Sequence, residues 1–289
     1  MFEKYLAGVS FTENIGQISI LSLTRRGATL HHIEEFRRAS DSPVWFLQPL
    51  LQRDEKVYRK VKRVSVAVDH ARLLFHVFPV DSELQDPGRK DQYAWELAQF
   101  VPEGTAADYV ADHHVLLNNS QTGTQEVLMI AARREFVLAI QNELNRNKFD
   151  CGLIDAAYFG AESSGVYSHS EIKNKQIALI GCFGVRADIG ILYNGRLIHY
   201  RFIETPTNGD IIAALEVIMQ QWPVEEIAFY GQSLSNRLIQ EVSEQFGKSS
   251  FAINALKGIQ SVVDRRLLQQ YVGREHVLAP SIGIALRKA

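Results

Sequence analysis

The sequence predicts an α/β protein with two lobes and a cleft between them. Two runs of alternating apolar residues, 6–23 and 177–195, each contain a short turn and are typical of β-hairpins. Further strands and helices follow each hairpin, so the two halves resemble a weak internal duplication. A third group of strands and helices separates them. Sheets flanked by helices in this order favour a two-lobed α/β architecture.

The first half of the chain is expected to be rich in strands. The turn-rich stretch "TENIG" divides the first hairpin, and the segments after it alternate between apolar and polar residues. These patterns predict strands at 6–23 (the hairpin), 28–39, 63–70 and 72–80.

A helix is expected over residues 40–54, between the strands at 28–39 and 63–70. Ser42 can cap its N-terminus, and Pro43 suits the first helical position. Pro49 should kink or end the helix, because proline lacks the N–H that the helical ladder needs.

The middle of the chain should form a separate module of two helices and two strands. Helix 87–102 is predicted from apolar residues at helical spacing, and Pro102 ends it. The apolar positions of that helix are Ala94, Leu97, Ala98 and Val101. Strands are expected at 108–117 and 125–133, followed by an amphipathic helix at 135–149 with Val137, Ile140 and Leu144 facing inward.

The second half alternates between strands and helices. Residues 151–160 should begin as a strand and turn into a helix at Asp155, whose carboxylate would cap the helix. After the hairpin 177–195, the pattern predicts a strand at 196–206, a helix at 209–221, a strand at 225–231, a helix at 233–246 that Gly247 ends, and a last helix at 279–289.

Composition narrows the class of protein. A formal net charge of −2, with basic residues spread along the chain, argues against nucleic acid as the main partner. No apolar run of ~18 residues predicts a membrane span, and the N-terminus lacks a signal core, so a cytoplasmic location is expected. The two cysteines, Cys151 and Cys182, fit a reducing compartment and are interpreted as core residues. The histidines show no metal-ligand spacing.

Several stretches resemble a known family. "QFVPE", "DHHVL", "VLMIAARRE" and "LIDAAYFGA" lie between residues 91 and 165, and "SIGIALR" lies near the end. Together they resemble the PilM family of type IV pilus assembly proteins, relatives of FtsA with an actin-like ATPase fold. The resemblance covers nearly the whole chain. It implies a first actin-like lobe at 1–71 and 149–175, an inserted module like that of FtsA at 72–148, and a second lobe at 176–289.

The resemblance also shows where this chain departs from the family. In the family, two hairpins with acids and glycines hold the nucleotide phosphates. Here Ser10, Thr12 and Gln17 stand for an acid, a glycine and a lysine of the first hairpin. Gly181 and Phe183 stand for the acid and the glycine of the second. Acids at these tips hold Mg²⁺ and orient water, and glycines let backbone N–H groups approach phosphate.

We therefore expect a relic nucleotide pocket and no ATP hydrolysis. The adenosine loop, "FYGQSLS" here, keeps one of three family glycines, Gly231. No bound cofactor is expected. The relic pocket would contain Ser10, Thr12, Glu13, Gln17, Gly181, Gly184, Arg186, Asp188 and Gly231.

Three of these side chains have plainer interpretations. Asp188 could replace the missing acid, although a solvent-facing strand position is favoured. Arg186 is interpreted as a solvated turn residue, and Glu13 as part of the first hairpin's turn, within reach of a metal.

The resemblance implies an adaptor at the inner face of the inner membrane. Its partner would be the N-terminal cytoplasmic tail of a PilN-like bitopic membrane protein, which in the family lies between the first lobe and the inserted module. Candidate contact residues, which could equally be core residues, are Val66, Phe75, Trp95 and Phe100. Three other hypotheses stay open: a nucleotide-regulated switch, a sugar-kinase or acyl-phosphate enzyme on the same fold, and an FtsA-like filament-forming protein.

Overall fold

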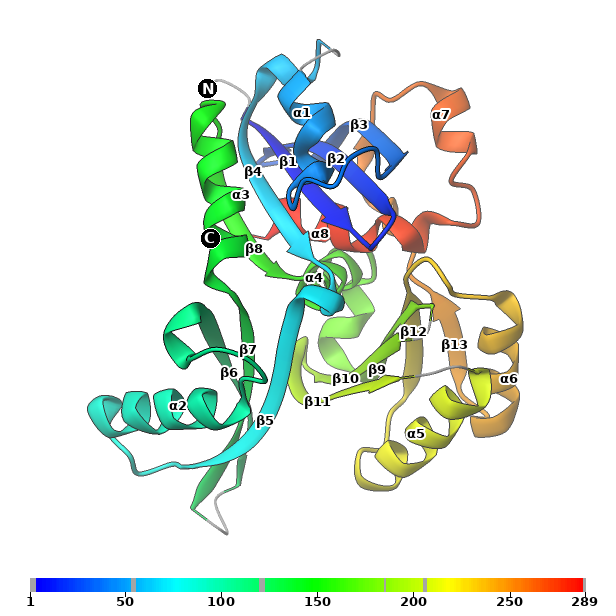
Figure 1. Ribbon diagram of the computed structural model, residues 1–289. Coiled ribbons are helices and arrows are strands. Elements are labelled where there is room, and N and C mark those ends of the chain that lie inside the picture. The colour runs from blue at the N-terminus through cyan, green and yellow to red at the C-terminus, as the bar shows by residue number, and fades with distance from the viewer. Residues whose placement is uncertain (1–3, 53–55, 120–122, 185, 205–206, 288–289) are drawn as a thin grey trace.

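A computed structural model describes residues 4–52, 56–119, 123–184, 186–204 and 207–287. It contains three sheets, and two of them lie one above the other with helices between them (Figure 1). Small parts of the expected segments 40–54, 196–206 and 279–289 lie outside the described residues.

The first large sheet has six strands. β1 pairs antiparallel with β2 and parallel with β4, and β4 pairs parallel with β8. In spatial order the strands are β14 (Gln260–Ser261), β3 (Gly27–Arg37), β2 (Ile15–Thr24), β1 (Tyr5–Phe11), β4 (Val61–Val68) and β8 (Asp150–Ala156).

The second large sheet repeats this arrangement. β9 pairs antiparallel with β10 and parallel with β12, which pairs parallel with β13. The spatial order is β11 (Arg196–Glu204), β10 (Arg186–Tyr193), β9 (Gln176–Phe183), β12 (Glu226–Tyr230) and β13 (Ser249–Ala252). Each sheet is thus a three-stranded meander followed by two parallel strands, as the internal duplication predicts.

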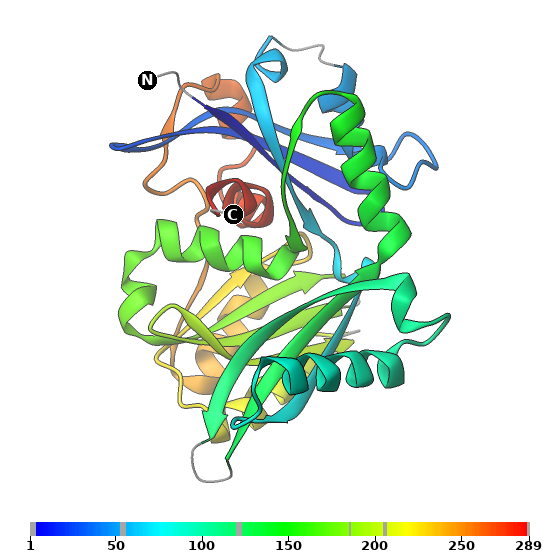
Figure 2. The same ribbon diagram turned by 90° about the vertical axis from the view of Figure 1, so that its left-hand side faces the viewer.

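Helices cover both large sheets. The first sheet packs against α1 (Gln48–Gln52) and α3 (Arg134–Arg146), and the second against α5 (Asn208–Gln221) and α6 (Asn236–Phe246). Between the two sheets lie α4 (Ala157–Ser168) and α8 (Ala279–Leu286), as Figures 1 and 2 show. A Cβ at Gly283 would lie 1.7 Å from the carbonyl oxygen of Gly160, so these two helices cross at backbone contact.

A third, three-stranded sheet forms the inserted module, with the order β5 (Leu73–Asp81), β7 (Thr124–Arg133) and β6 (Tyr109–Asn119). Helix α2 (Asp86–Phe100) packs on it. We propose that α3 belongs to the first lobe and not to the module, because Phe136, Ile140 and Leu144 are part of the core under the first sheet. The other expected lobe boundaries remain a proposal.

Several local predictions are wrong. Residues 45–47 form a 3-10 helix, and Pro49 is the second residue of α1, so it begins the α-helix instead of ending it. In α2 the inward side chains are Tyr93, Leu97 and Phe100, whereas Ala94 and Ala98 are exposed. The aromatic side chains face the module's sheet because they stack on its histidines. Tyr93 stacks on His113 at 4.1 Å, and Phe100 stacks on His76 at 4.4 Å.

Among the strands and α-helices, three short elements were not predicted: β13, β14 and α7 (Arg265–Gln269). In α3 the buried residue of the first turn is Phe136, and the predicted Val137 is half-buried. Asp155 also differs from its prediction. The N-cap of α4 is Ala156, and the Asp155 carboxylate forms an ion pair with Arg287 at the end of α8.

Candidate functional site

The turns of the two predicted phosphate hairpins face each other across a cleft of about 420 Å³. Four of the predicted residues line it: Thr12, Glu13, Gly184 and Arg186. The Thr12 hydroxyl donates to the side-chain oxygen of Gln232, 3.4 Å away in the loop after β12. The cleft is therefore where the sequence places it, but a polar contact already joins its two sides.

Ser10 and Gln17 do not line this cleft. Ser10 is buried and donates to the Gln17 side-chain oxygen at 3.2 Å. The Gln17 amide in turn donates to a Glu35 carboxylate oxygen at 3.0 Å. The two residues that, by the resemblance, stand for an acid and a lysine thus hydrogen-bond to each other within the sheet.

Asp188 is the largest departure from the sequence interpretation. It is 1% exposed, so the prediction of a solvent-facing residue is wrong. Both faces of β10 are covered, and its burial does not alternate. Asp188 lies directly opposite Gly181 in the hairpin register, and a Cβ at Gly181 would come within 1.8 Å of the Asp188 Oδ1. The carboxylate of Asp188 therefore fills the space beside Gly181, where the family has its acid.

A histidine and a tyrosine hold this buried carboxylate. His70 Nε2 lies 2.6 Å from Asp188 Oδ2, and the Tyr230 hydroxyl donates to both carboxylate oxygens at 2.8 and 3.0 Å. Burial, and then the charge of Asp188, raises the pKa of Tyr230 well above its usual value, so its hydroxyl stays a donor. Sequence reasoning missed both partners, because neither lies near Asp188 in the chain.

His70 connects all three sheets. It follows β4 and precedes β5, and its ring stacks on Phe75 at 5.0 Å and on Phe202 at 5.5 Å. The ring of Phe183 lies 5.5 Å away. The interior of the cleft is therefore an aromatic cluster around one buried His–Asp pair.

The tip of the second hairpin uses its own polar groups. The Gly184 N–H donates to the Ser233 hydroxyl at 2.6 Å, and the Ser233 N–H donates to the Cys182 carbonyl at 3.1 Å. Gly231 has a φ of 107°, and a Cβ there would lie 2.3 Å from the Cys182 oxygen, so close packing on β9 accounts for this glycine. The Arg186 guanidinium lies over the Phe202 ring.

The acids at the mouth of the cleft form no metal site. Asp69 Oδ1 accepts from the Ala71 N–H at 3.0 Å, and burial raises the pKa of Asp69. Within the described ranges, no group of three or more His, Cys, Asp or Glu side chains could hold a metal ion.

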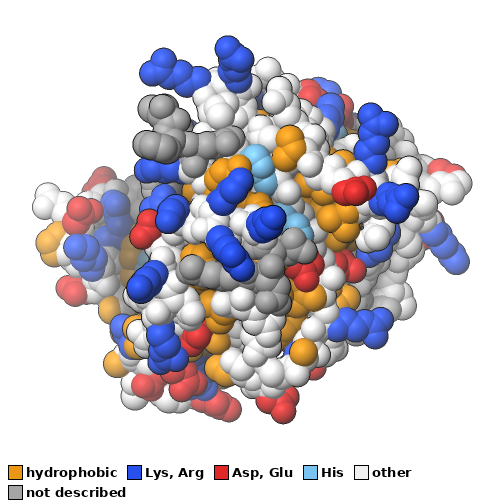
Figure 3. All heavy atoms as spheres, turned by 90° about the horizontal axis from the view of Figure 1, so that it is seen from above, with side chains coloured by type: hydrophobic (Ala, Val, Ile, Leu, Met, Phe, Trp, Pro, Cys, Tyr) orange, Lys and Arg blue, Asp and Glu red, His pale blue; other side chains and the backbone are white. Residues whose placement is uncertain are grey.

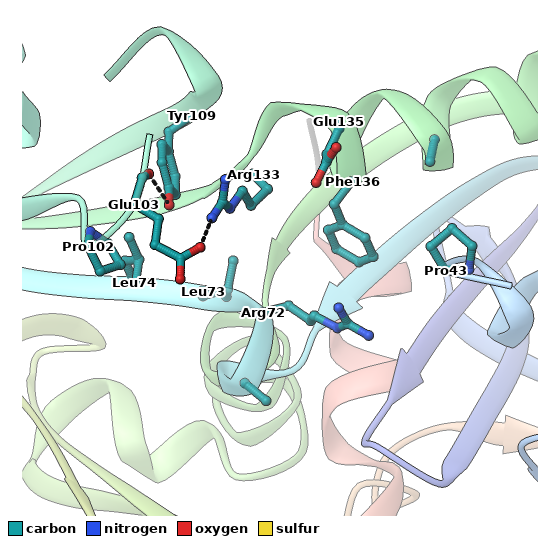
Figure 4. A pocket seen from close by; sticks show the side chains of 12 residues that line it. Pro43, Arg72, Leu73, Leu74, Pro102, Glu103, Tyr109, Arg133, Glu135 and Phe136 are labelled. Carbon is teal, nitrogen blue, oxygen red and sulfur yellow. Dashed lines mark hydrogen bonds and ion pairs between the residues drawn. The ribbon is translucent and has the colours of Figure 1, made fainter. Parts of the chain in front are cut away.

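A second and larger cavity lies between the first lobe and the module (Figure 4). This groove encloses about 670 Å³. Leu73 and Leu74 at the start of β5 and Phe136 of α3 contribute apolar surface, and Pro43 and Pro102 lie at opposite sides. Leu73 and Leu74 are the first residues of β5, which within the described strands pairs only with β7, so its other edge is unpaired.

Charged residues of both signs border this groove. Arg133 pairs with Glu103 at 2.8 Å and lies 5.1 Å from the Tyr109 ring. Arg72 lies over the Phe136 ring at 5.7 Å, and no ion pair joins it to another described residue. Glu135 at the start of α3 is exposed. The groove thus offers an apolar floor, a strand edge and an unpaired cation.

The four predicted partner residues do not form one surface. Val66 is fully buried in the core of the first sheet, so its assignment to the groove is wrong. Phe75 packs in the aromatic cluster around His70, and Phe100 stacks on His76. Trp95 is 60% exposed on α2 and does not line the groove. Leu74, at the start of β5, and Phe136, in the first turn of α3, do line the groove.

Comparison with known proteins places the fold. No protein-family model matches the sequence, and a search of the curated proteins gave no match. Several solved structures are similar to this protein, and one of them, from Bacteroides thetaiotaomicron, is a protein with an actin-like ATPase fold and unknown function. It has a TM-score of 0.58 at 13% identity, over 88% of this chain and 93% of that one. The protein described here therefore has the actin-like fold.

A second structure is the PilM–PilN type IV pilus biogenesis complex, with a TM-score of 0.76. The match covers 99% of this chain and 98% of that one, at 13% identity. The resemblance to PilM that the sequence predicts is confirmed at the level of the fold.

Proposed function

We propose that this protein is a non-enzymatic adaptor of a type IV pilus or a related secretion machinery. It would sit at the inner face of the inner membrane and bind the N-terminal cytoplasmic tail of a PilN-like bitopic membrane protein. Among the described residues, no helix is both long and apolar enough to cross a bilayer.

The groove between the first lobe and the module carries this proposal. Its apolar floor suits the side chains of an extended peptide, and the unpaired edge of β5 suits backbone pairing with it. Arg72 would take an acid of the peptide. The similarity of the fold to PilM, solved together with PilN, supports a PilN-like partner.

The chemistry of the cleft supports a role without ATP hydrolysis. Asp188 is the acid nearest to the expected catalytic position, and it is buried against His70 and Tyr230. The Gly184 N–H, which would face a phosphate, already has the Ser233 hydroxyl as its acceptor. A nucleotide would have to break these contacts before it could bind Mg²⁺ or phosphate as the family does.

Site-specific crosslinking in cells tests the groove. A photoreactive amino acid at Leu74 should crosslink to the N-terminal tail of a bitopic membrane protein, identified by mass spectrometry. The same amino acid at Val77, on the same strand but outside the groove, is the matched control. Crosslinks to another part of the partner, or equal yields at both positions, would count against the groove.

A second measurement uses charge. Leu74→Arg should abolish co-purification of that partner, whereas Val77→Arg should leave it intact, because Leu74 lines the groove and Val77 does not. If deletion of the partner's tail left co-purification unchanged, the tail would not be the ligand.

One observation favours an alternative, a nucleotide-binding switch of the same machinery. The cleft between the hairpin turns still encloses about 420 Å³ and keeps Arg186 on its wall. Calorimetry with Mg-ATP and Mg-ADP separates the two. The adaptor proposal expects no heat of binding, and saturable binding would favour the switch.

A further inference from the structure

Basic residues gather at one edge of the first sheet. The register places the start of β1, the β2–β3 turn, the start of β4 and the start of β8 side by side: Tyr5 lies opposite Ser22 and Val61, and Arg63 opposite Asp150. We call this surface the basic edge and define it as residues 4–5, 24–27, 56–63 and 146–150. Figure 3 looks onto this end of the molecule and shows Lys and Arg side chains gathered over it.

The basic edge holds ten basic residues and one acid, Asp150, although the whole chain has a net charge of −2. Half of them come from one stretch, "KVYRKVKR" at 56–63. All ten are exposed: Lys4, Arg25, Arg26, Lys56, Arg59, Lys60, Lys62, Arg63, Arg146 and Lys148.

Within the part of the chain that the structure describes, most of this charge has no ion-pair partner. Between described residues, one ion pair involves the ten, Arg146 with Glu143 at 3.1 Å. Lys60 lies over the Tyr5 ring at 5.3 Å. Keeping so many like charges together is unfavourable for the folded protein by itself, and an anionic surface relieves the repulsion.

The shape of the basic edge favours lipid headgroups over nucleic acid. It consists of strand ends, turns and the end of α3, so it presents no helix flank that could enter a major groove. Its three aromatic rings are unavailable for stacking on bases, because Lys60 covers Tyr5, and Tyr58 and Phe149 are only 2% and 3% exposed. What remains is a surface of spread cations, which can bind phosphate groups but cannot read a base sequence.

We propose that the basic edge binds the anionic surface of a membrane. The inference rests on the proposed function in one respect, since a bitopic partner would bring the protein close to a bilayer. Anionic lipids attract Lys and Arg near their surface, by a factor of about five in affinity for each residue. The basic edge would thus orient the adaptor on the membrane and add to the affinity for its partner.

Vesicle flotation with the full chain and no partner tests the proposal. The vesicles contain either phosphatidylcholine alone or equal parts of phosphatidylcholine and phosphatidylglycerol. The protein should float with the anionic vesicles only, and high salt should release it. Flotation with both kinds of vesicle, or with neither, would overturn the proposal.

Matched variants locate the effect. The triple substitution Lys56→Gln, Arg59→Gln and Lys62→Gln should weaken anionic-vesicle binding about 10²-fold. The control is the triple substitution Lys90→Gln, Lys173→Gln and Arg196→Gln, which removes the same charges from exposed positions elsewhere and should have little effect. Equal losses in both triples would mean that net charge alone drives binding.

Two further arms separate the outcomes. Duplex DNA is added as a competitor at the same salt, and displacement from the vesicles by low DNA concentrations would indicate a nucleic-acid site instead. Crosslinking through Leu74 is repeated with both triples. If vesicle binding fails while that crosslink persists, this inference is wrong and the adaptor proposal stands. If vesicle binding persists while the crosslink fails, the adaptor proposal is wrong and this inference stands.

Discussion

Removal of the Asp188 carboxylate should destabilise the protein strongly. Asp188→Ala deletes a group that is 1% exposed and that contacts His70 at 2.6 Å and Tyr230 at 2.8 and 3.0 Å. The substitution leaves the buried Tyr230 hydroxyl and the His70 ring without this partner. An orphaned buried polar group costs about 1–3 kcal/mol. Because two such groups lose their partner, we expect a loss of about 2–6 kcal/mol in the free energy of unfolding.

Urea unfolding followed by tryptophan fluorescence measures this loss. A change of this size is a large share of the ~5–15 kcal/mol that stabilises a typical domain. The matched control is Asp112→Ala, whose side chain is 79% exposed and which should change stability by less than about 0.5 kcal/mol. A loss below about 1 kcal/mol for Asp188→Ala would refute the view that this carboxylate holds the two lobes together.

A double-mutant cycle isolates the pair. If His70→Ala and Asp188→Ala remove the same interaction, the double variant should be less destabilised than the sum of the single variants, by about 1–3 kcal/mol. Strict additivity would mean that the two residues stabilise the fold separately, and the aromatic rings around His70 would then be the source of its contribution.

Other substitutions test further contacts of the structure. Gly181→Asp, which restores the acid of the family, should destabilise by about 2 kcal/mol or more and should not create ATP hydrolysis, because its Cβ would lie 1.8 Å from Asp188 Oδ1; a stable variant with measurable phosphate release would contradict this. Burial raises the pKa of Glu162 to about 7. Because the unfolded carboxyl ionises first, stability should fall by about 2–3 kcal/mol as the pH rises from about 4.5 to about 7. Glu162→Gln should remove that fall and be the more stable form at pH 8, and parallel pH curves for the two proteins would contradict it. Gly283→Ala should cost about 2 kcal/mol or more in thermal unfolding, since its Cβ would meet the Gly160 carbonyl oxygen at 1.7 Å, whereas Gly258→Ala, with open space around its Cβ but a φ of 78°, should cost only about 1 kcal/mol.

Local patterns predicted most of the elements. The hairpins β1–β2 and β9–β10 follow from apolar alternation around turn residues, and α6 ends at Gly247, which adopts a φ of 61° as a left-handed cap. The repeated hairpin-led pattern also indicated an internal duplication, and the two large sheets share their arrangement of strands. These features depend on neighbours within a few residues, and the sequence contains that information directly.

The position of the site's polar groups depended on contacts between distant segments. Alternation from the turn left the side of Asp188 open, and solvent was the favoured choice. Since β10 is buried on both faces, no side chain at that position could reach solvent. His70 is 118 positions earlier in the chain, and only the packing of the two lobes brings it to the carboxylate.

The sequence by itself therefore determined the two-lobed α/β architecture, because hairpins and helices follow from local spacing. Its resemblance to the PilM family implied that the phosphate-binding residues are lost. The tertiary structure decided where the remaining acid lies, which residues form the groove and which cations share one edge. Those outcomes depend on burial and strand register between segments far apart in the chain, and a single sequence contains no local signal for such long-range contacts.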